Sequence, residues 1–505
     1  MPEYPMRSAA GVEVAPIAAP IRGGVGVSWP LLFGVSGFLL PALTGWGLMD
    51  PDTYWHIAAG RWMLAHGAVL MHDPFSFTMH GAAWVAQEWG AELLIAWTYG
   101  IAGWAGLVFL AAACFAAALA YLLRFLLSRM EPLHALVLTF LAANMMFPSL
   151  LARPHALVWP LTAVWVGALV NASEQRRAPP WWLLGVMLLW ANMHGSYILG
   201  IGVAVVFALD SVVGAREERW GVARRWLAFV AASCACVLVN PQGYRLFLFP
   251  FRLLGMNSLD YIAEWRQPNL QHFQMLSLWL AVILGLAFIG RIRLSLPRNA
   301  LLLGLLFMAL QHARNIALLG LLSPFILAWP VAALWRRLPS AARNPSALDR
   351  GLANLSHRAA PMTVSAALVA AALIAGIALH FRRPHPPQYG APQAALDTIL
   401  AKGAGQRILN DYGFGGYLIF RGVPVFMDGR ADLYGDAFLR RAVDALSLAP
   451  GGHLRALLGT YRISAILLRP GWPAVQLLNR MPGWKRVYAD EGAVAYVRRE
   501  EGTTT

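Results

Sequence analysis

Charged residues are scarce in this chain of 505 residues: Asp, Glu, Lys and Arg make up 13% of it, whereas a typical soluble domain carries about 25%. Hydrophobic residues make up 58%, and the mean hydropathy is +0.54. This balance excludes an ordinary soluble protein and indicates an integral membrane protein. The 21 Trp and 46 Gly agree with this class, because Trp favours the bilayer interface and Gly is tolerated in membrane-spanning helices.

Cysteine is almost absent. The three that occur, Cys114, Cys234 and Cys236, all lie inside apolar stretches. Cysteines in such positions predict neither a disulfide framework nor a zinc-binding motif.

Acidic residues are the scarcer of the two charged classes: 25 Asp and Glu face 40 Lys and Arg, which gives a net charge of +15. A basic excess can indicate nucleic-acid binding. Here almost all of it is Arg in short loops between apolar runs, which is the positive-inside pattern of membrane proteins. We therefore expect the lipid bilayer, and no nucleic acid, as a partner.

Apolar runs long enough to cross a hydrocarbon core of ~30 Å predict about eleven spans. Their approximate positions are 29–48, 103–124, 132–150, 156–172, 181–197, 198–214, 226–240, 276–290, 299–311, 316–335 and 361–380. With this count, the Arg-rich loops all fall on one side, which is the cytoplasmic side. The sequence thus predicts a multi-pass protein of a bacterial cytoplasmic (inner) membrane, with a disordered cytoplasmic tail at 1–28 and a C-terminus outside.

The composition changes after residue 380, so we divide the chain into a transmembrane domain at 29–380 and a periplasmic α/β domain at 381–505. A Pro-rich linker, RRPHPPQYGAP, marks the boundary. The segments RILNDYGFGGYLIF and VPVFMDG predict strands joined by Gly-rich turns, and 436–460 has a helical pattern. ISAILL predicts a buried strand, and WKRVYADEGAVAYVRR predicts a hairpin around Asp-Glu-Gly.

The first outer loop, at 49–88, has an unusual number of acids for a membrane boundary. It contains DPDTYWH, DPFSFT and AQEWGAE, and its candidate catalytic residues are Asp50, Asp52, His56, Asp73 and Glu88. Helix capping by Asp52 explains one of them without any chemistry. Paired carboxylates can instead bind a divalent cation such as Mg²⁺ or Mn²⁺, with Asp52 as the candidate ligand. One of them can also act as a general base toward an acceptor hydroxyl.

Other unusual polar residues also fall at the predicted outer ends of spans. They include the candidate substrate-binding residues Arg153, His155, His194, Glu264, Arg266, His312 and Arg314. A single histidine at a span end is more often an interface residue held by hydrogen bonds. Ionisable groups at membrane depth are rare and line sites or pathways, so their accumulation on one side indicates a cavity that opens outward. Arginines suit a phosphate ligand, because a guanidinium group bonds two oxygens at once.

The outer loop 241–275 is rich in aromatic residues and arginines. Two interpretations remain open for it. It is either an amphipathic segment that lies on the membrane or a loop that closes over a bound lipid-linked donor.

The segment DTYWHIAAGRW, followed by DPFSFTMHG, resembles the first loop of GT-C superfamily membrane glycosyltransferases, and most closely that of oligosaccharyltransferase catalytic subunits. NDYGFGGYLIFRGVPVFMDGRADLYGD is similar to their Trp-Trp-Asp-Tyr-Gly segment and the Val-Asp-Gly stretch that follows it. The resemblance implies a polytopic α-helical membrane enzyme that moves a sugar from a polyprenyl-phosphate carrier to an acceptor on the outer face. Asp52 matches the first-loop aspartate that binds metal or serves as base, and Asp411 and Tyr412 match the later Asp-Tyr pair.

The sequence departs from this family at three places. Leu409 and Asn410 stand where the family has two tryptophans. The second outer loop, SLLARPH, lacks an acidic pair, and Glu264 is the stand-in for a missing Thr-x-x-Glu. The acceptor is therefore not expected to be an asparagine sequon, and metal dependence is left open.

Three classes of function remain at this point. The leading hypothesis is a membrane glycosyltransferase with a polyprenyl-phosphate-linked donor and a glycan, lipid or protein acceptor. The alternatives are a transporter or flippase of lipid-linked or small polar substrates, and a non-catalytic assembly protein that retains the GT-C fold.

Overall fold

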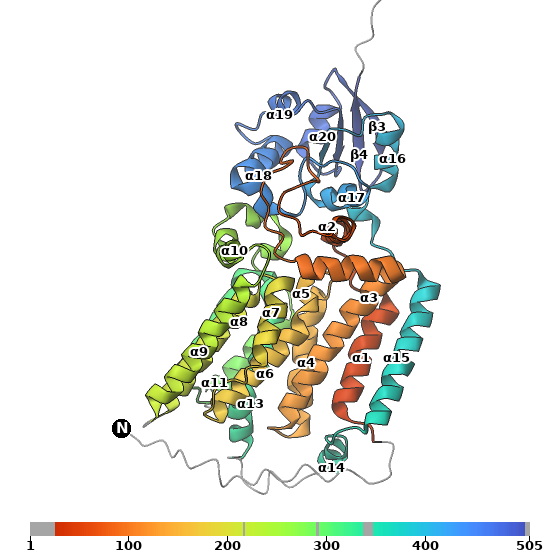
Figure 1. Cartoon of the computed structure of the whole chain (residues 1–505). Helices are drawn as coiled ribbons and strands as arrows, with labels where there is room; N and C mark the ends of the chain where they lie inside the picture. The colour runs from red at the N-terminus through yellow and green to blue at the C-terminus, as the bar shows by residue number, and fades with distance from the viewer. Residues whose placement is uncertain (1–25, 216–217, 289–291, 337–346, 500–505) are drawn as a thin grey trace, which may run out of the picture.

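The computed structural model describes residues 26–215, 218–288, 292–336 and 347–499. Most of the tail predicted at 1–28 lies outside the described residues. Apolar helices run side by side in a bundle, and an α/β unit lies at one end of it (Figure 1). The bundle helices are α1 (Trp29–Thr44), α3 (Trp89–Leu127), α4 (Pro132–Met146), α6 (Trp159–Glu174), α7 (Leu183–Met193), α8 (Tyr197–Gly214), α9 (Arg219–Leu238), α11 (Met275–Phe288), α12 (Leu296–Gln311), α13 (Ile316–Arg336) and α15 (Pro361–Arg382).

Several bundle helices have the dimensions of membrane spans. Among the described residues, six helical stretches are long and apolar enough to cross a bilayer; they contain α3, α4, α8, α9, α13 and α15. Four further apolar helices, α1, α7, α11 and α12, are shorter. Each of these helices lies at one of the runs predicted from the sequence. The chain is thus a helix-rich protein with membrane-type helices, as its composition indicates.

Helix α3 is interrupted at Gly103, whose φ of 57° lies in the left-handed region that glycine adopts without steric cost. The part before Gly103 lies across the end of the bundle, and the part after it runs down through the bundle (Figure 1). The predicted span at 103–124 begins at this break. The break brings the start of α3 next to the α/β unit.

The α/β unit contains a four-stranded sheet in the order β1–β2–β4–β3. Strands β1 and β2 are parallel, and the other two pairs are antiparallel. The predicted buried strand is β2, and the predicted hairpin is β3–β4. The elements of this unit are β1 (Ile408–Asn410), β2 (Ala465–Leu468), β3 (Trp484–Ala489), β4 (Val494–Arg498), α16 (Gln393–Ala401), α17 (Gly415–Phe420), α18 (Ala431–Ser447), α19 (Leu454–Thr460) and α20 (Pro473–Leu478).

The prediction of a strand across GGYLIF is wrong, because this segment forms helix α17. Strand β1 ends before it, and the carboxylate of Asp411 accepts a hydrogen bond from the main-chain N–H of Gly413 at 2.9 Å, which starts a turn. Glycine then allows α17 to approach the first loop closely: a Cβ at Gly416 would lie 2.6 Å from the carbonyl oxygen of Pro51. A local pattern could not reveal this contact.

The segment VPVFMDG is also not a regular strand. Its Val425 forms isolated bridges with Ser76 of the first loop and with Ile408 of β1. The segment therefore links the first loop to the edge of the sheet.

The first loop lies between the bundle and the α/β unit. Its helix α2 (Asp52–His66) packs against α3 on one side and α17 on the other (Figure 1). A Cβ at Gly60 would clash with the carbonyl of Glu92, so glycine is needed for the close approach of α2 to α3. On the other side, the ring centroid of Tyr54 lies 5.2 Å from that of Tyr417. The start of α2 is thereby held at the junction of the two parts.

Candidate active site

Two carboxylates stand at the start of α2. Asp50 accepts a hydrogen bond from the main-chain N–H of Asp52 at 2.8 Å. The predicted N-cap role of Asp52 is thus wrong: Asp52 is the first residue of the helix and makes no capping hydrogen bond. Asp50 satisfies the helix terminus, and the carboxylate of Asp52 remains available to the cavity that it lines.

The guanidinium group of Arg153 joins three acids from distant segments. Its Nη1 lies 2.7 Å from Asp50 Oδ2 and 3.2 Å from Glu264 Oε2, and its Nη2 lies 3.1 Å from Asp52 Oδ2. Arg153 precedes the short helix α5 (Pro154–Leu157), and Glu264 belongs to a 3₁₀ turn at Ala263–Trp265. Glu264 also pairs with Arg314 at 3.3 Å.

Asp52, Arg153, Glu264 and Arg314 line a cavity of about 810 Å³, whereas Asp50 is not on its wall. This volume is within the size range of small-molecule sites, roughly 300–1,000 Å³. The predicted site residues on its wall are Asp52, Glu88, Arg153, His155, His194, Glu264, His312, Arg314 and Tyr412. The remaining wall is largely apolar, with side chains such as Met145, Phe249 and Met308. The cavity therefore has a charged end and a long apolar surface.

The pKa values of the cavity acids are shifted in different directions, depending on the balance between burial and nearby positive charge. Burial raises the pKa of Asp52 to about 7, although the charge of Arg153 opposes the shift. It raises the pKa of Glu88 to about 7 in the same way. For Glu264 the nearby guanidinium groups of Arg153 and Arg314 outweigh burial and lower the pKa to about 2. At neutral pH Glu264 is thus ionised, whereas Asp52 and Glu88 can each gain or lose a proton.

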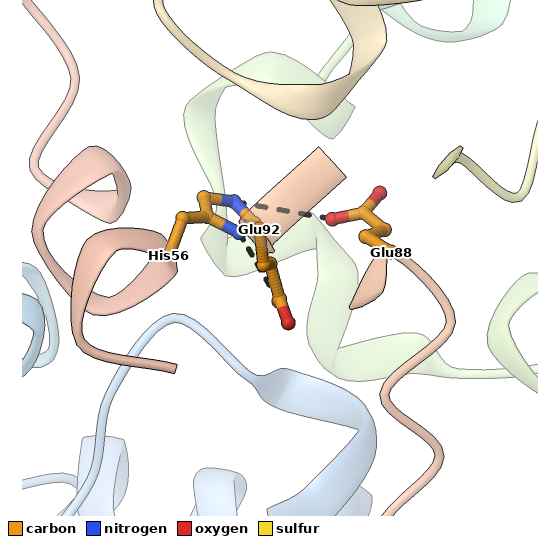
Figure 2. Close-up of side chains that lie close together, drawn as sticks. All are labelled: His56, Glu88 and Glu92. Carbon is orange, nitrogen blue, oxygen red and sulfur yellow. Dashed lines mark hydrogen bonds and ion pairs between the residues drawn. The ribbon is translucent and has the colours of Figure 1, made fainter. Parts of the chain in front are cut away.

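His56 is not on the cavity wall and interacts with two glutamates, as Figure 2 shows. Its Nδ1 lies 3.3 Å from Glu92 Oε1, and its Nε2 lies 3.9 Å from Glu88 Oε2. The other oxygen of Glu88 lies 3.4 Å from His194 Nε2. The main-chain N–H of Ser196 donates to His194 Nδ1, so the Nε2–H of a neutral His194 points to Glu88. Glu88 is held from both sides and has its free face in the cavity.

Two places in this site can be compared as cation sites. His56, Glu88 and Glu92 offer one ligand atom each, all within 4.8 Å of one another, and this nitrogen–oxygen set suits a transition metal. His56 Nε2 and Glu92 Oε2 are buried without a hydrogen-bond partner among the described residues, which agrees with such a ligand. At Asp52 the fit is poor, because Arg153 already lies against the carboxylate oxygens.

Asp73 has a different environment from the other predicted catalytic residues. It is buried outside the cavity wall and accepts hydrogen bonds from the N–H and hydroxyl of Ser76. It also pairs with Arg430 at 2.7 Å, and Arg430 pairs in turn with Asp428 at 2.6 Å. This buried network links the first loop to the α/β unit.

The structure also places Arg266 and Asp411 away from the cavity wall. Arg266 donates to the carbonyl of Asp260 on an exposed turn. Asp411 accepts a hydrogen bond from the indole N–H of Trp472 at 2.6 Å, in addition to the turn described above. Its neighbour Tyr412 does line the cavity, and its hydroxyl donates to the carbonyl of Gly429 at 3.1 Å.

The sequence interpretation missed two acids of the site. Asp432 lines the cavity and accepts a hydrogen bond from the indole of Trp84 at 3.1 Å; burial raises its pKa to about 6. Glu92 completes the group around His56. For Glu92 a signal existed: it follows Glu88 by four residues, so one helical turn brings both to the same face. Asp432 has no comparable local signal.

Two solved structures align with nearly the whole chain. One is the archaeal oligosaccharyltransferase AglB from Archaeoglobus fulgidus, in complex with an inhibitory peptide and a dolichol-phosphate: 12% identity, TM-score 0.51, 94% of this chain and 74% of that chain. The other is ArnT from Cupriavidus metallidurans bound to undecaprenyl phosphate: 14% identity, TM-score 0.50, 94% of this chain and 98% of that chain. The chain has a GT-C-like fold.

The GT-C-like fold agrees with the resemblance noted in the first loop and in the segment after β1. No protein-family model and no curated protein sequence matches the chain. At 12–14% identity the structural similarity concerns the fold alone. The activity has to be argued from the residues of the cavity.

Proposed function

We propose that the protein is a membrane glycosyltransferase that moves a sugar from a polyprenyl-phosphate-linked donor to a hydroxyl of a glycan, lipid or protein acceptor. One observation carries the proposal: Asp52 shares a single cavity with the guanidinium groups of Arg153 and Arg314. A carboxylate with a pKa near neutrality is suited to take a proton from a hydroxyl. Arginine is suited to hold the phosphate that leaves.

The shape of the cavity supports an amphiphilic donor. Leu254 and Phe307 line the cavity but are also 66% and 62% exposed, so the apolar wall continues to the outer surface of the bundle. In a membrane this mouth faces lipid. A polyprenyl chain fits the apolar wall, with its phosphate and sugar at the charged end. The solved structures with the same fold contain dolichol-phosphate and undecaprenyl phosphate, which are carriers of this class.

The proposed reaction is a single displacement that inverts the sugar carbon. Asp52, or Asp50 beside it, accepts the proton of the acceptor hydroxyl as the new oxygen–carbon bond forms. The bond between the sugar carbon and the phosphate oxygen breaks, and its electron pair stays on the lipid phosphate. Arg314 lies with its guanidinium 4.5 Å from the ring centroid of Trp265, in position to stabilise that developing charge.

The other predicted residues receive binding and positioning roles. Glu88, held by His194 and His56, offers a carboxyl to sugar hydroxyls, while His155, His312 and Tyr412 line the walls. A metal ion held by His56, Glu88 and Glu92 would fix the orientation of Glu88 and join α2 to α3. Arg266, Asp73 and Asp411 retain supporting roles in the loops and turns around the cavity.

We place this site at the outer face of a bacterial cytoplasmic membrane. In this arrangement all of the about eleven predicted helices cross the bilayer. The Arg-rich loops and the N-terminal tail are cytoplasmic, and the residues from 381 onward form a periplasmic domain. That domain contributes Tyr412 and Asp432 to the cavity wall.

Sugar transfer by purified wild type, Asp52→Asn and Asp50→Asn tests this proposal. The assay supplies a radiolabelled polyprenyl-phosphate-linked sugar pool and membrane acceptors, and the product is identified by mass spectrometry. Loss of a general base lowers the rate by roughly 10²–10⁴-fold, so Asp52→Asn should fall by that factor with unchanged thermal stability. Asp397→Asn, in an exposed ion pair, is the matched control.

Full transfer by both Asp52→Asn and Asp50→Asn would refute the assignment of the base. The transporter alternative makes a different prediction. If lipid-linked sugar crosses vesicle membranes in the presence of the wild-type protein and no sugar is transferred, the protein is a flippase.

A further inference from the structure

We propose that Arg153 takes the place of a divalent cation among Asp50, Asp52 and Glu264, so that sugar transfer by this chain does not depend on a metal at Asp52. The proposal rests on the proposed function for its catalytic consequence. Its structural part, that the three acids bind an organic cation instead of a metal, stands on the geometry alone.

Three acids converge on one guanidinium group. Asp50 and Asp52 come from the start of α2, and Glu264 comes from a loop more than 200 positions later in the sequence. Their oxygens lie at 2.7, 3.1 and 3.2 Å from the two terminal nitrogens of Arg153. Three carboxylates around one centre is an arrangement in which proteins bind Mg²⁺, Mn²⁺ or Ca²⁺. Here the centre is a guanidinium group.

Space and charge both disfavour a metal ion at this centre. A divalent cation needs oxygens at about 2.0–2.6 Å. The nitrogens of Arg153 lie within 3.2 Å of one oxygen of each acid, so they occupy the volume between these oxygens. A metal ion there would also be repelled by the positive charge of the guanidinium. The Arg153 side chain is only 14% exposed.

The main chain around Arg153 is fixed in this position. Pro154 restricts the preceding residue to extended conformations, and Arg153 has φ −130° and ψ 161°. Ala152 donates its N–H to the carbonyl of Gly47 at 2.7 Å, and its own carbonyl accepts from the hydroxyl of Thr53 at 3.3 Å. The segment with the arginine is thereby tied to both sides of the short segment that carries Asp50 and Asp52.

The possible metal site at His56, Glu88 and Glu92 is distinct from the acids around Arg153. It contains none of the three acids that bind Arg153. Any metal bound there is present whether or not residue 153 is an arginine. A comparison between variants at position 153 therefore isolates the three acids.

The first experiment counts bound Mn²⁺ by electron paramagnetic resonance in detergent-purified wild type, Arg153→Ala, and Arg153→Ala combined with Asp52→Asn. We expect Arg153→Ala to bind one Mn²⁺ more than wild type, and the double variant to lose that additional ion. Equal counts in wild type and Arg153→Ala would overturn the proposal. Arg153→Gln, which keeps more of the side-chain volume, replaces Arg153→Ala if the latter unfolds.

The second experiment measures transfer in the presence of EDTA. Wild type should keep its rate within twofold, Arg153→Ala should lose about 100-fold or more, and added guanidinium ion should restore part of that loss. A wild-type enzyme that EDTA inactivates and that Mn²⁺ restores, with no added Mn²⁺ site in Arg153→Ala, would overturn the proposal. If no variant transfers sugar, the proposed function fails, and the Mn²⁺ counts still decide the role of Arg153.

Discussion

The charge state of Asp52 links its surroundings to a measurable property. Burial raises its pKa from 3.8 to about 7, so the carboxyl is ionised above pH 7 and protonated below it. If Asp52 is the base, the rate at low substrate concentration falls about tenfold per pH unit below 7 and levels off above it. Initial rates measured between pH 5 and 9 test this pH dependence. A rate that is unchanged down to pH 5 would rule out Asp52 as the base.

Gly429 provides a second test at a single position. A Cβ on this residue would clash with the carboxylate of Asp52, so Gly429→Ala must displace either the loop or the acid. We expect transfer to fall by about 10²-fold, because small misplacements of reacting groups are that costly. Gly459→Ala is the matched control, since its Cβ would meet no atom within 4 Å. Full activity of purified Gly429→Ala would show that the position of Asp52 is not critical.

Among single residues, ionisable side chains that are costly to place at a membrane boundary could be predicted from the sequence. Residues that reach the site only through the folding of distant segments could not. Asp50, Asp52 and Glu88 could be singled out because acids are energetically costly at a membrane boundary and are therefore rare there without a function. The sequence gives no reason to connect Asp432 with them, since it reaches the cavity through folding of the α/β unit. The partner of Asp73 is likewise 357 positions away, at Arg430.

Among the elements, the buried ion-pair network joins the first loop to α18. Arg430 neutralises both Asp73 and Asp428, and all three are almost completely buried. Arg430→Ala leaves two buried carboxylates without a counter-charge, which costs about 3–5 kcal/mol. We expect a clear drop in the thermal unfolding midpoint and faster proteolysis of the linker after α15. Arg421→Ala, which breaks an exposed pair, should cost less than about 1 kcal/mol.

An unchanged unfolding midpoint in Arg430→Ala would contradict the role of this network in holding the first loop to the α/β unit. If Arg430→Ala lost sugar transfer but kept its stability, Arg430 and Asp73 would have a role in the reaction and not only in holding the fold.

The elements themselves were predictable where hydropathy dominates. The bundle helices follow from long apolar runs, and the β3–β4 hairpin follows from the Asp-Glu-Gly turn between two strand-like segments. The prediction was wrong for GGYLIF, where a strand-like composition forms α17. In this helix Gly416 lies in close contact with the first loop, and this contact is not visible in a local pattern.

For the whole molecule, the cavity belongs to neither part alone. Its wall runs from Asp52 in the first loop, through Arg153 and Arg314 between bundle helices, to Asp432 in the α/β unit. Charge topology could predict that these residues share one side of a membrane. It could not predict that Arg153 would lie among Asp50, Asp52 and Glu264, because that requires the positions of three segments of the chain relative to one another.

The orientation in the membrane is testable with two cysteines placed at opposite ends of the molecule. The background replaces Cys114, Cys234 and Cys236 by alanine. Glu491 lies on an exposed turn of the α/β unit, and Arg177 lies in an exposed loop after α6. Helix α6 runs away from the α/β unit toward the other end of the bundle (Figure 1). In intact spheroplasts, a membrane-impermeant maleimide should label Glu491→Cys and leave Arg177→Cys unlabelled, because the proposed topology places the Arg-rich loops in the cytoplasm.

Permeabilised cells provide the control, because both cysteines should then react. The reverse pattern in intact spheroplasts would place the cavity on the cytoplasmic side. A polyprenyl-linked donor would then have to present its sugar there, so the same labelling experiment decides which leaflet supplies the substrate.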